Sequence, residues 1–208
     1  MAELTGRGRV DKRRAILDAA FAVFARDGYA QAGVDVIAAE AGVAKATVYN
    51  HFGDKETLLR ATFGALAESA LERNLAAVER LRESGEELEE VGFLLARCYC
   101  DERSRAMRRL LAAEAGRFPD LLDIVQGQVA DRVAQALADR LARLSLAGRL
   151  RTPDPLLAAE QFLALLTGPA ETRSRLGTRD VPDEELRDVA KAAARTFLAA
   201  FSDVRRAS

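Results

Sequence analysis

The chain has 208 residues, which is enough for one large core or for a small domain joined to a medium one. Hydrophobic residues make up 49% and charged residues 30%, with Ala, Leu, Arg and Glu dominant, so we expect an all-α protein with almost no strand. The formal net charge of −1 excludes a protein that coats nucleic acid through overall positive charge.

The first predicted helix spans Asp11 to Asp27, and Gly28 supplies its stop. The segment that leads into this helix is basic, because only Glu3 and Asp11 oppose its cations. These cations are Arg7, Arg9, Lys12, Arg13 and Arg14. This basic arm is either a solvated tail or a contact for the phosphate backbone or minor groove of a nucleic acid.

Two short helices are predicted next, over residues 34–41 and 44–52, with Gly42 between them. In a helix-turn-helix, the first helix needs small residues where the second crosses it, and the turn needs a glycine that can adopt positive φ. The alanines of the first helix and Gly42 meet both requirements. Burial of Val48 and Phe52 would leave the other side of the second helix available for the major groove of DNA.

Asp54 can cap a long helix that runs from Lys55 to about Leu81. Apolar periodicity then predicts helices near 86–100, 102–115, 119–146, 154–167 and 183–202. The helix that follows Asp154 is apolar around nearly its whole circumference, and the last helix has a broad apolar stripe. We therefore expect these two helices to pack against a second copy of the chain and form a homodimer.

Several short motifs occur in order and at fixed distances between Ala15 and Leu59. They are Ile37-Ala38, Ala41-Gly42-Val43, Thr47-Val48-Tyr49, His51-Phe52 and Lys55-Glu56-Thr57-Leu58-Leu59. This series resembles the TetR family of regulators, and its spacing makes the resemblance specific. The resemblance implies a three-helix DNA-binding domain with a helix-turn-helix at residues 1–53 and a larger helical domain for ligand binding and dimerisation at residues 54–208.

The resemblance also implies DNA contacts along the second helix of the motif, first at base edges and then at the phosphate backbone. The residues concerned are Lys45, Ala46, Thr47, Tyr49, Asn50 and His51. Lys55 stands at the N-terminus of the next helix, where its ammonium and the helix dipole can hold a phosphate. Each of these residues also has a purely structural interpretation. Lys45 could be a solvated charge, Tyr49 an aromatic that packs between helices, and His51 a surface or core residue whose hydrogen-bonding groups have partners.

Three positions depart from the family pattern. The family often has hydroxyl residues where this chain has Ala32, Gly33 and Ala44. Glycine can still cap a helix, but the two alanines cannot. We expect fewer contacts to the DNA backbone and regard the basic arm as a candidate to compensate.

The middle helices hold enough apolar and aromatic residues for a core, and the resemblance implies that some of them face a small-molecule effector instead. The stretch from Arg109 to Leu121 is similar to the ligand-binding domain of one subgroup of the family. The candidate ligand-binding residues are Phe93, Arg97, Tyr99, Met107, Leu111, Glu114 and Phe118.

Residues for catalysis or metal binding are scarce. Cys98 and Cys100 are two apart in a helical stretch and cannot bridge, and with the single histidine they cannot form a zinc site without acidic ligands. The acidic residues are instead interpreted as i,i+4 partners of arginines, such as Asp101 with Arg105. We expect no metal, no cofactor and no enzyme.

The sequence contains neither an apolar run of membrane-spanning length nor a signal peptide, so we expect a cytoplasmic protein without membrane contact. The resemblance to the TetR family implies a repressor that binds a palindromic double-stranded DNA operator and is released by a small, largely apolar ligand. The alternative is a helical small-molecule-binding protein with weak or lost DNA recognition, and an all-α enzyme is a third candidate.

Overall fold

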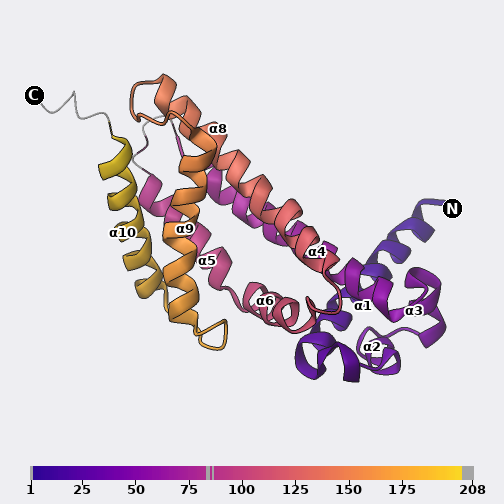
Figure 1. Ribbon diagram of the computed structural model, residues 1–208. Coiled ribbons are helices and arrows are strands. Elements are labelled where there is room, and N and C mark those ends of the chain that lie inside the picture. Colours follow the sequence, from indigo (N-terminus) through magenta and orange to yellow (C-terminus); the bar gives the residue numbers. More distant parts are fainter. Residues whose placement is uncertain (1, 83–84, 86, 203–208) are drawn as a thin grey trace, which may run out of the picture. The chain divides into compact units, whose positions relative to one another are not determined.

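The computed structural model describes residues 2–82, 85 and 87–202, with side chains from Asp11 onward (Figure 1). The described backbone is helical apart from its turns and an isolated antiparallel bridge between Leu150 and Ser202. Among the described helices, none combines the length and the apolar character that a membrane span requires. The prediction of an all-α fold is confirmed.

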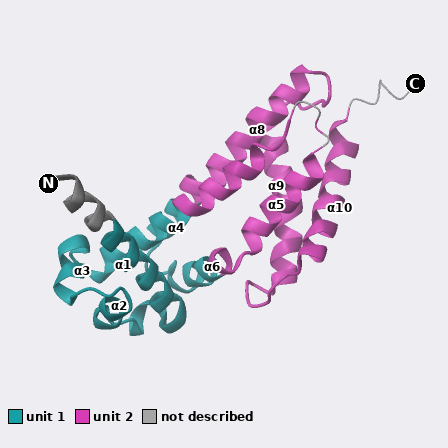
Figure 2. Ribbon diagram, turned by 180° about the vertical axis from the view of Figure 1, so that it is seen from behind, with its two compact units in different colours: residues 1–67, 106–125 teal, residues 68–105, 126–208 magenta. Residues whose placement is uncertain are grey.

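The chain forms two compact units, which Figure 2 shows in different colours. Unit 1 contains residues 1–67 and 106–125, and unit 2 contains residues 68–105 and 126–208. The helices α4 (Lys55–Val78) and α6 (Glu102–Glu114) contribute to both units. The boundary predicted after residue 53 separates a DNA-binding domain from a ligand-binding domain. It is a functional boundary, which the packing units do not test, so it stays a prediction.

Unit 1 is built around three N-terminal helices, with which parts of α4 and α6 also pack. The helices that lie wholly within it are α1 (Ala2–Gln31), α2 (Val34–Glu40), α3 (Lys45–Phe52) and α7 (Asp120–Val125). Large apolar side chains with almost no exposed surface fill its core. They are Ile16, Phe24, Ile37, Leu58, Leu59, Phe63 and Leu121.

The first helix begins at Ala2, well before the predicted start at Asp11. The leading segment contains no proline, and its two glycines lower helix propensity without ending the helix. Near the other end, Gly28 has φ 73° and ψ 161°, so the backbone leaves the helical region at the predicted stop. A short helical turn follows this kink and ends at Gln31.

Unit 2 is a bundle in which α5 packs against α9 and α10, and α8 packs against α9. Its helices are α5 (Leu88–Cys100), α8 (Asp131–Leu146), α9 (Pro155–Ser174) and α10 (Asp183–Phe201). Phe162 of α9 and Phe197 of α10 meet edge to face, with ring centroids 5.2 Å apart. Gly92 of α5 permits this close packing, because a Cβ atom there would lie 3.2 Å from Cζ of Phe162.

Two helices of the C-terminal half differ from their predicted bounds. The segment predicted as one helix over 119–146 consists of α7, a π-helical turn (Gln126–Ala130) without buried residues, and α8. Helix α9 continues past its predicted end at Thr167 and past Pro169. A proline removes one backbone hydrogen bond, but burial of the next turn, which includes Ala170, keeps the helix intact.

Two glycines in unit 1 allow a matched test of the turn after α2. Gly42 has φ 66°, whereas Gly64 lies inside α4, and a Cβ atom at either position would meet no heavy atom within 4 Å. Gly42→Ala should lower the free energy of unfolding by about 1–2 kcal/mol, because an L-residue is strained at positive φ. Gly64→Ala should raise it by about 0.5–1 kcal/mol through better helix propensity. Urea unfolding measures both, and effects of the same sign would contradict the role given to Gly42.

Candidate nucleic-acid interface

The turn between α2 and α3 has the hydrogen bonds of a glycine-terminated helix. The N–H of Val43 donates to the carbonyl of Ala38 at 3.0 Å, and the N–H of Gly42 donates to that of Ala39 at 3.1 Å. With φ 66° at Gly42, this is a Schellman ending for α2. The predicted glycine turn of a helix-turn-helix is therefore present.

Helix α3 has one buried side and one exposed side. Val48 and Phe52 are buried, as predicted, and the guanidinium of Arg13 from α1 lies 5.6 Å from the centre of the Phe52 ring. The side chain of Tyr49 is 42% exposed, so it does not pack as a core aromatic. Among the other predicted DNA contacts of α3, Lys45, Ala46 and Asn50 are exposed, and Thr47 and His51 are half-buried.

The N-terminus of α3 has no side-chain cap. Ala44 occupies the N-cap position with an extended backbone at φ −70° and ψ 147°, and its carbonyl accepts from the N–H of Thr47 at 2.8 Å. The N-cap of α2, Gly33, also caps without a side chain. The ammonium of Lys45, the first residue of α3, is paired with Asp35 of α2.

Lys55 lies at the start of α4 but its ammonium is turned toward α1. The Nζ atom is 4.5 Å from the centre of the Tyr29 ring and donates to the carbonyl of Ala30 at 3.3 Å. Burial lowers the pKa of Lys55, the nearby Arg117 lowers it further, and Glu114 opposes the shift. The Tyr29 ring and the Ala30 carbonyl together hold the ammonium toward α1.

The helix that Lys55 begins is capped by Asp54, as predicted. The N–H of Thr57 donates to Oδ1 of Asp54 at 2.7 Å. This backbone hydrogen bond is the main reason why the pKa of Asp54 lies below its ordinary value. The carboxylate therefore stays charged at the positive end of the α4 dipole.

The end of α6 and the segment after it are fastened to α1 and α4 within unit 1. The Tyr29 N–H donates to Oε1 of Glu114 at 3.3 Å, and the rings of Tyr29 and Phe118 meet edge to face at 4.9 Å. Arg60 of α4 donates to Oδ2 of Asp120 at 2.6 Å, and its guanidinium lies 5.5 Å from the centre of the Phe118 ring. The sequence did not predict this set of contacts, because the partners in it lie far apart in the chain, for example 60 positions for Arg60 and Asp120 and 85 for Tyr29 and Glu114.

The seven predicted ligand-binding residues fall into both units. Met107, Leu111, Glu114 and Phe118 belong to unit 1, where Met107 and Phe118 are buried in the core and Leu111 packs against it. Phe93, Arg97 and Tyr99 belong to unit 2. Their assignment to ligand binding stays a prediction.

The three predicted ligand-binding residues of unit 2 lie on α5 in different surroundings. Phe93 is buried, and the guanidinium of Arg187 from α10 lies 4.4 Å from its ring centre. A surface depression of about 290 Å³ adjoins this pair and is lined also by Glu89 and Glu90. The hydroxyl of Tyr99 donates to Oε2 of Glu171 at 3.0 Å, and Arg97 is exposed.

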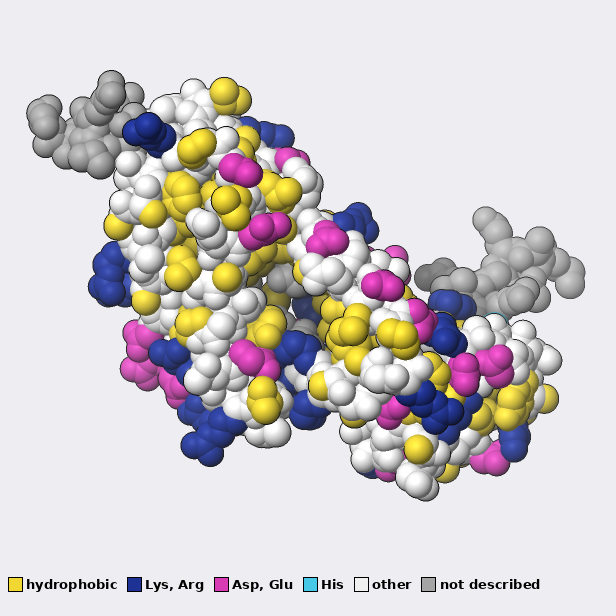
Figure 3. Space-filling model, viewed as in Figure 1, with side chains coloured by type: hydrophobic (Ala, Val, Ile, Leu, Met, Phe, Trp, Pro, Cys, Tyr) yellow, Lys and Arg dark blue, Asp and Glu magenta, His cyan; other side chains and the backbone are white. Residues whose placement is uncertain are grey.

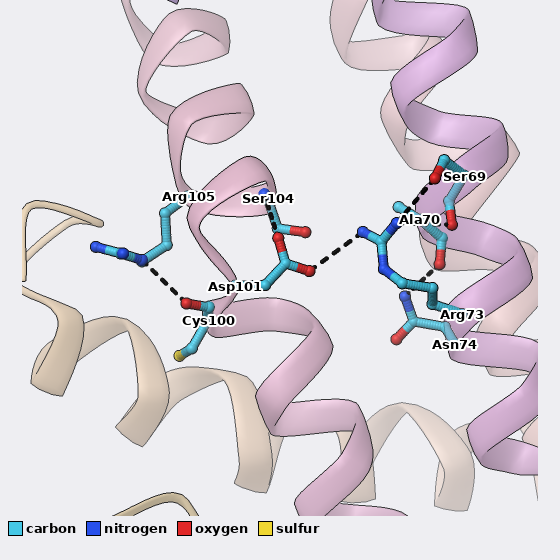
Figure 4. A network of polar contacts seen from close by, with 8 residues as sticks. All are labelled: Ser69, Ala70, Arg73, Asn74, Cys100, Asp101, Ser104 and Arg105. Atoms are coloured by element: carbon cyan, nitrogen blue, oxygen red, sulfur yellow. Dashed lines mark hydrogen bonds and ion pairs between the residues drawn. The ribbon is translucent and has the colours of Figure 1, made fainter. Parts of the chain in front are cut away.

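A polar network joins α4 to the junction of α5 and α6 in unit 2 (Figure 4). Asp101 accepts from Arg73 Nη2 at 3.1 Å through one carboxylate oxygen and from the N–H of Ser104 at 2.7 Å through the other. Arg73 also donates to Oγ of Ser69 at 2.8 Å. Asp101 thus caps α6 and pairs with α4 at the same time.

The predicted pairing of Asp101 with Arg105 is wrong. Arg105 is buried and donates to the carbonyl of Cys100 at 3.0 Å and to that of Gly177 at 3.3 Å, and it also pairs with Asp180. The i,i+4 spacing failed here because Asp101 precedes the first turn of α6 and turns back to cap it, which leaves the guanidinium of Arg105 to the loop after α9.

Hydrophobic side chains gather on the face of unit 2 that α9 and α10 present (Figure 3). Leu156 and Leu157, at the start of α9, are 41% and 49% exposed. Leu163 and Leu165 of α9 and Phe201 of α10 are only partly buried.

Among the described side chains, no group of three or more His, Cys, Asp or Glu residues is placed to hold a metal ion.

The double role of Asp101 can be separated by two substitutions. Asp101→Ala removes both the cap and the ion pair with Arg73 and should lower the free energy of unfolding by about 1–2 kcal/mol. Asp101→Asn should lower it by about half as much, because asparagine also caps helices. Urea unfolding measures the two losses, and equal losses would show that the cap contributes nothing.

Two protein-family models match the chain. The model described as "Bacterial regulatory proteins, tetR family" matches residues 16–62, which contain α2 and α3. The model described as "AefR-like transcriptional repressor, C-terminal domain" matches residues 86–203. Together the two models cover both the helix-turn-helix and the bundle of unit 2.

Individual proteins of known structure or curated function are also similar. The HTH-type transcriptional repressor AcnR of Corynebacterium efficiens is 29% identical over 167 residues, which cover 78% of this chain and 81% of that protein. The crystal structure of a TetR-family transcriptional regulator from Mesorhizobium loti is 30% identical with a TM-score of 0.85, covering 94% of this chain and 98% of that one. The flavonoid-responsive regulator FrrA is 31% identical with a TM-score of 0.70, covering 93% and 98%.

Proposed function

The chain belongs to the TetR family of transcriptional regulators, and we propose that it is a homodimeric repressor that a small, largely apolar ligand releases from DNA. The family consists of DNA-binding regulators rather than enzymes, in agreement with the sequence prediction. The observation that carries the proposal is the α2–turn–α3 motif, in which Val48 and Phe52 are buried while the polar side of α3 stays accessible.

In this proposal, α3 enters the major groove and residues 1–53 form the DNA-binding domain. Lys45 and Ala46 face base edges, Thr47 and Asn50 touch a base or a phosphate, and the later residues Tyr49 and His51 reach the backbone. Lys55 joins them at a phosphate, and the N-terminus of α4 adds its dipole. In the basic arm, the side chains of Arg7 and Arg9 lie outside the described residues.

A pair of exposed amides tests the DNA contacts. Asn50→Ala removes an amide from α3, and Gln135→Ala removes an exposed amide from α8 in unit 2. Asn50→Ala should weaken binding to the promoter DNA that flanks the gene by about fivefold to a hundredfold, as loss of one base or phosphate contact does. Gln135→Ala should leave binding unchanged. Fluorescence anisotropy of labelled DNA with the full chain measures both.

The outcome of this titration also separates the proposal from its alternative. Salt-sensitive and sequence-selective binding by the unsubstituted protein supports a DNA-binding regulator. If the protein binds no DNA even at low salt, it is a helical small-molecule-binding protein that has lost DNA recognition. If Asn50→Ala and Gln135→Ala bind alike, the assignment of α3 as the reading helix is wrong.

The homodimer is proposed to form through α9 and α10. The support is the partly exposed apolar side chains on these helices, which a monomer would leave in water. In a two-fold dimer both copies use the same surface, so each of these residues is buried in both protomers. The two recognition helices would then enter successive major grooves about 34–36 Å apart.

Two leucines of similar exposure test this dimer surface. Leu157 of α9 is 49% exposed and Leu122 of α7 in unit 1 is 48% exposed. Leu157→Glu should weaken dimerisation by about a hundredfold or more, because the substitution places two charges in a symmetric apolar interface. Leu122→Glu should leave the dimer intact. Sedimentation equilibrium over a concentration series measures both, and two dimers of equal strength would contradict the proposed interface.

The effector is proposed to be small and largely apolar, and the similarity to a flavonoid-responsive regulator supports an aromatic molecule. Phe93, Arg97 and Tyr99 are proposed ligand contacts of unit 2, and Met107, Leu111, Glu114 and Phe118 those of unit 1. A ligand that binds one conformation of the dimer more tightly shifts the population toward it, and DNA is released if that conformation spaces the two α3 helices wrongly. A protein that reads chromosomal DNA in this way would work in the cytoplasm, as expected from the sequence.

A further inference from the structure

The first residue of α3 is held by a carboxylate from the neighbouring helix. The Nζ atom of Lys45 lies 2.9 Å from both carboxylate oxygens of Asp35, the second residue of α2. The two side chains are 51% and 72% exposed, so the pair is accessible to a macromolecule that approaches α3. The hydrogen bond to Asp35 raises the pKa of Lys45, so the ammonium stays charged.

Fold stability does not explain this pair. An exposed ion pair contributes little to the free energy of unfolding. A lysine at the start of a helix opposes the helix dipole, and α3 has no acidic residue in its first turn and no capping side chain to offset it. A carboxylate on the surface that meets DNA also repels phosphate. Asp35 lies in the first turn of α2, where a negative charge suits the helix dipole, so it is Lys45 whose placement has a cost that a purely structural role would not require.

We propose that Asp35 is a specificity-determining residue, which reserves the ammonium of Lys45 for a neutral acceptor on a base edge and disfavours a phosphate. The inference rests on the proposed function, in which α3 reads the major groove. An ammonium has three N–H donors, so Lys45 can donate to Asp35 and to a base acceptor such as guanine O6 or N7 at once. A phosphate in the same place would put a second anion beside the carboxylate.

The consequence is a difference between operator and non-specific DNA. Non-specific binding depends on cations that neutralise phosphates and release counterions. While Lys45 is paired with Asp35, it adds no net charge to that binding. At a matching base the pair is kept and Lys45 still contributes, so Asp35 raises the ratio of specific to non-specific affinity.

Glu40 provides a matched control on the same helix. Its carboxylate accepts from Nη1 of Arg26 in α1 at 2.9 Å and is not paired with α3. Asp35→Asn and Glu40→Gln each replace one exposed carboxylate of α2 by an amide of nearly the same shape. An effect of total charge would be common to both variants, whereas an effect that acts through Lys45 would be limited to Asp35→Asn.

The experiment uses the full chain and two DNA duplexes. One duplex is selected by the unsubstituted protein from a random-sequence pool, and the other is its shuffled sequence. Affinities are measured by anisotropy across a salt series. For Asp35→Asn, the affinity for the shuffled duplex should rise about fivefold to tenfold near 0.1 M salt, with a slope of log affinity against log salt steeper by about 0.9 per bound protomer. Affinity for the selected duplex should change by less than about threefold, because the base contact of Lys45 already exists there.

The specificity ratio of Asp35→Asn should therefore fall severalfold, while Glu40→Gln keeps the ratio of the unsubstituted protein. In a Lys45→Met background, Asp35→Asn should no longer change the ratio, because Asp35 acts through Lys45. The unfolding midpoint of Asp35→Asn should stay close to that of the unsubstituted protein, which separates the effect from a loss of structure.

An unchanged ratio and slope for Asp35→Asn would overturn the inference, as would equal changes in Asp35→Asn and Glu40→Gln. A change in the ratio that persists in the Lys45→Met background would overturn it as well. If the unsubstituted protein does not distinguish the two duplexes, both the inference and the proposed DNA reading fail. If it does distinguish them while Asp35→Asn keeps the ratio, the inference alone fails.

Discussion

The backbone of Gly42 turns the chain at φ 66°, which brings its own N–H and that of Val43 to the last carbonyls of α2. These two hydrogen bonds end α2 and set the direction in which α3 leaves the turn. Because α3 leaves in that direction, Val48 and Phe52 enter the core of unit 1 and the polar side of α3 stays accessible. The DNA-binding surface, its pairing with Asp35 and the proposed reading of a major groove all depend on this turn.

Phe118 and Glu114, two of the predicted ligand contacts, also make packing and pairing contacts in the unit that carries the helix-turn-helix. Phe118 packs on Tyr29, and Glu114 accepts from the Tyr29 backbone next to the kink at Gly28. The same Tyr29 ring receives the ammonium of Lys55 at the start of α4. A displacement of the end of α6 would therefore change aromatic and charged contacts with α1 and α4. These contacts lie in the unit that also contains α3.

The sequence was most informative where the deciding interactions are local. The alanines and Gly42 of the turn, the cap at Asp54 and the burial of Val48 follow from spacing over a few residues, and all are present in the structure. The sequence was least informative where partners are distant, as with Arg105 and Asp180, which are 75 positions apart. Apolar periodicity also predicted one continuous helix through residues 126–130, where the backbone forms a π turn. It identified the apolar face of each helix, but not which of the two units that face packs in.

If α3 of each protomer reads a major groove, hydroxyl-radical footprinting of the full chain on the promoter DNA that flanks its gene should show two protected blocks on one face of the duplex. The blocks should lie one helical turn of about 34–36 Å apart, at a site that unrelated DNA does not offer. Protection that is absent, or that spreads evenly along any duplex, would contradict this role of α3.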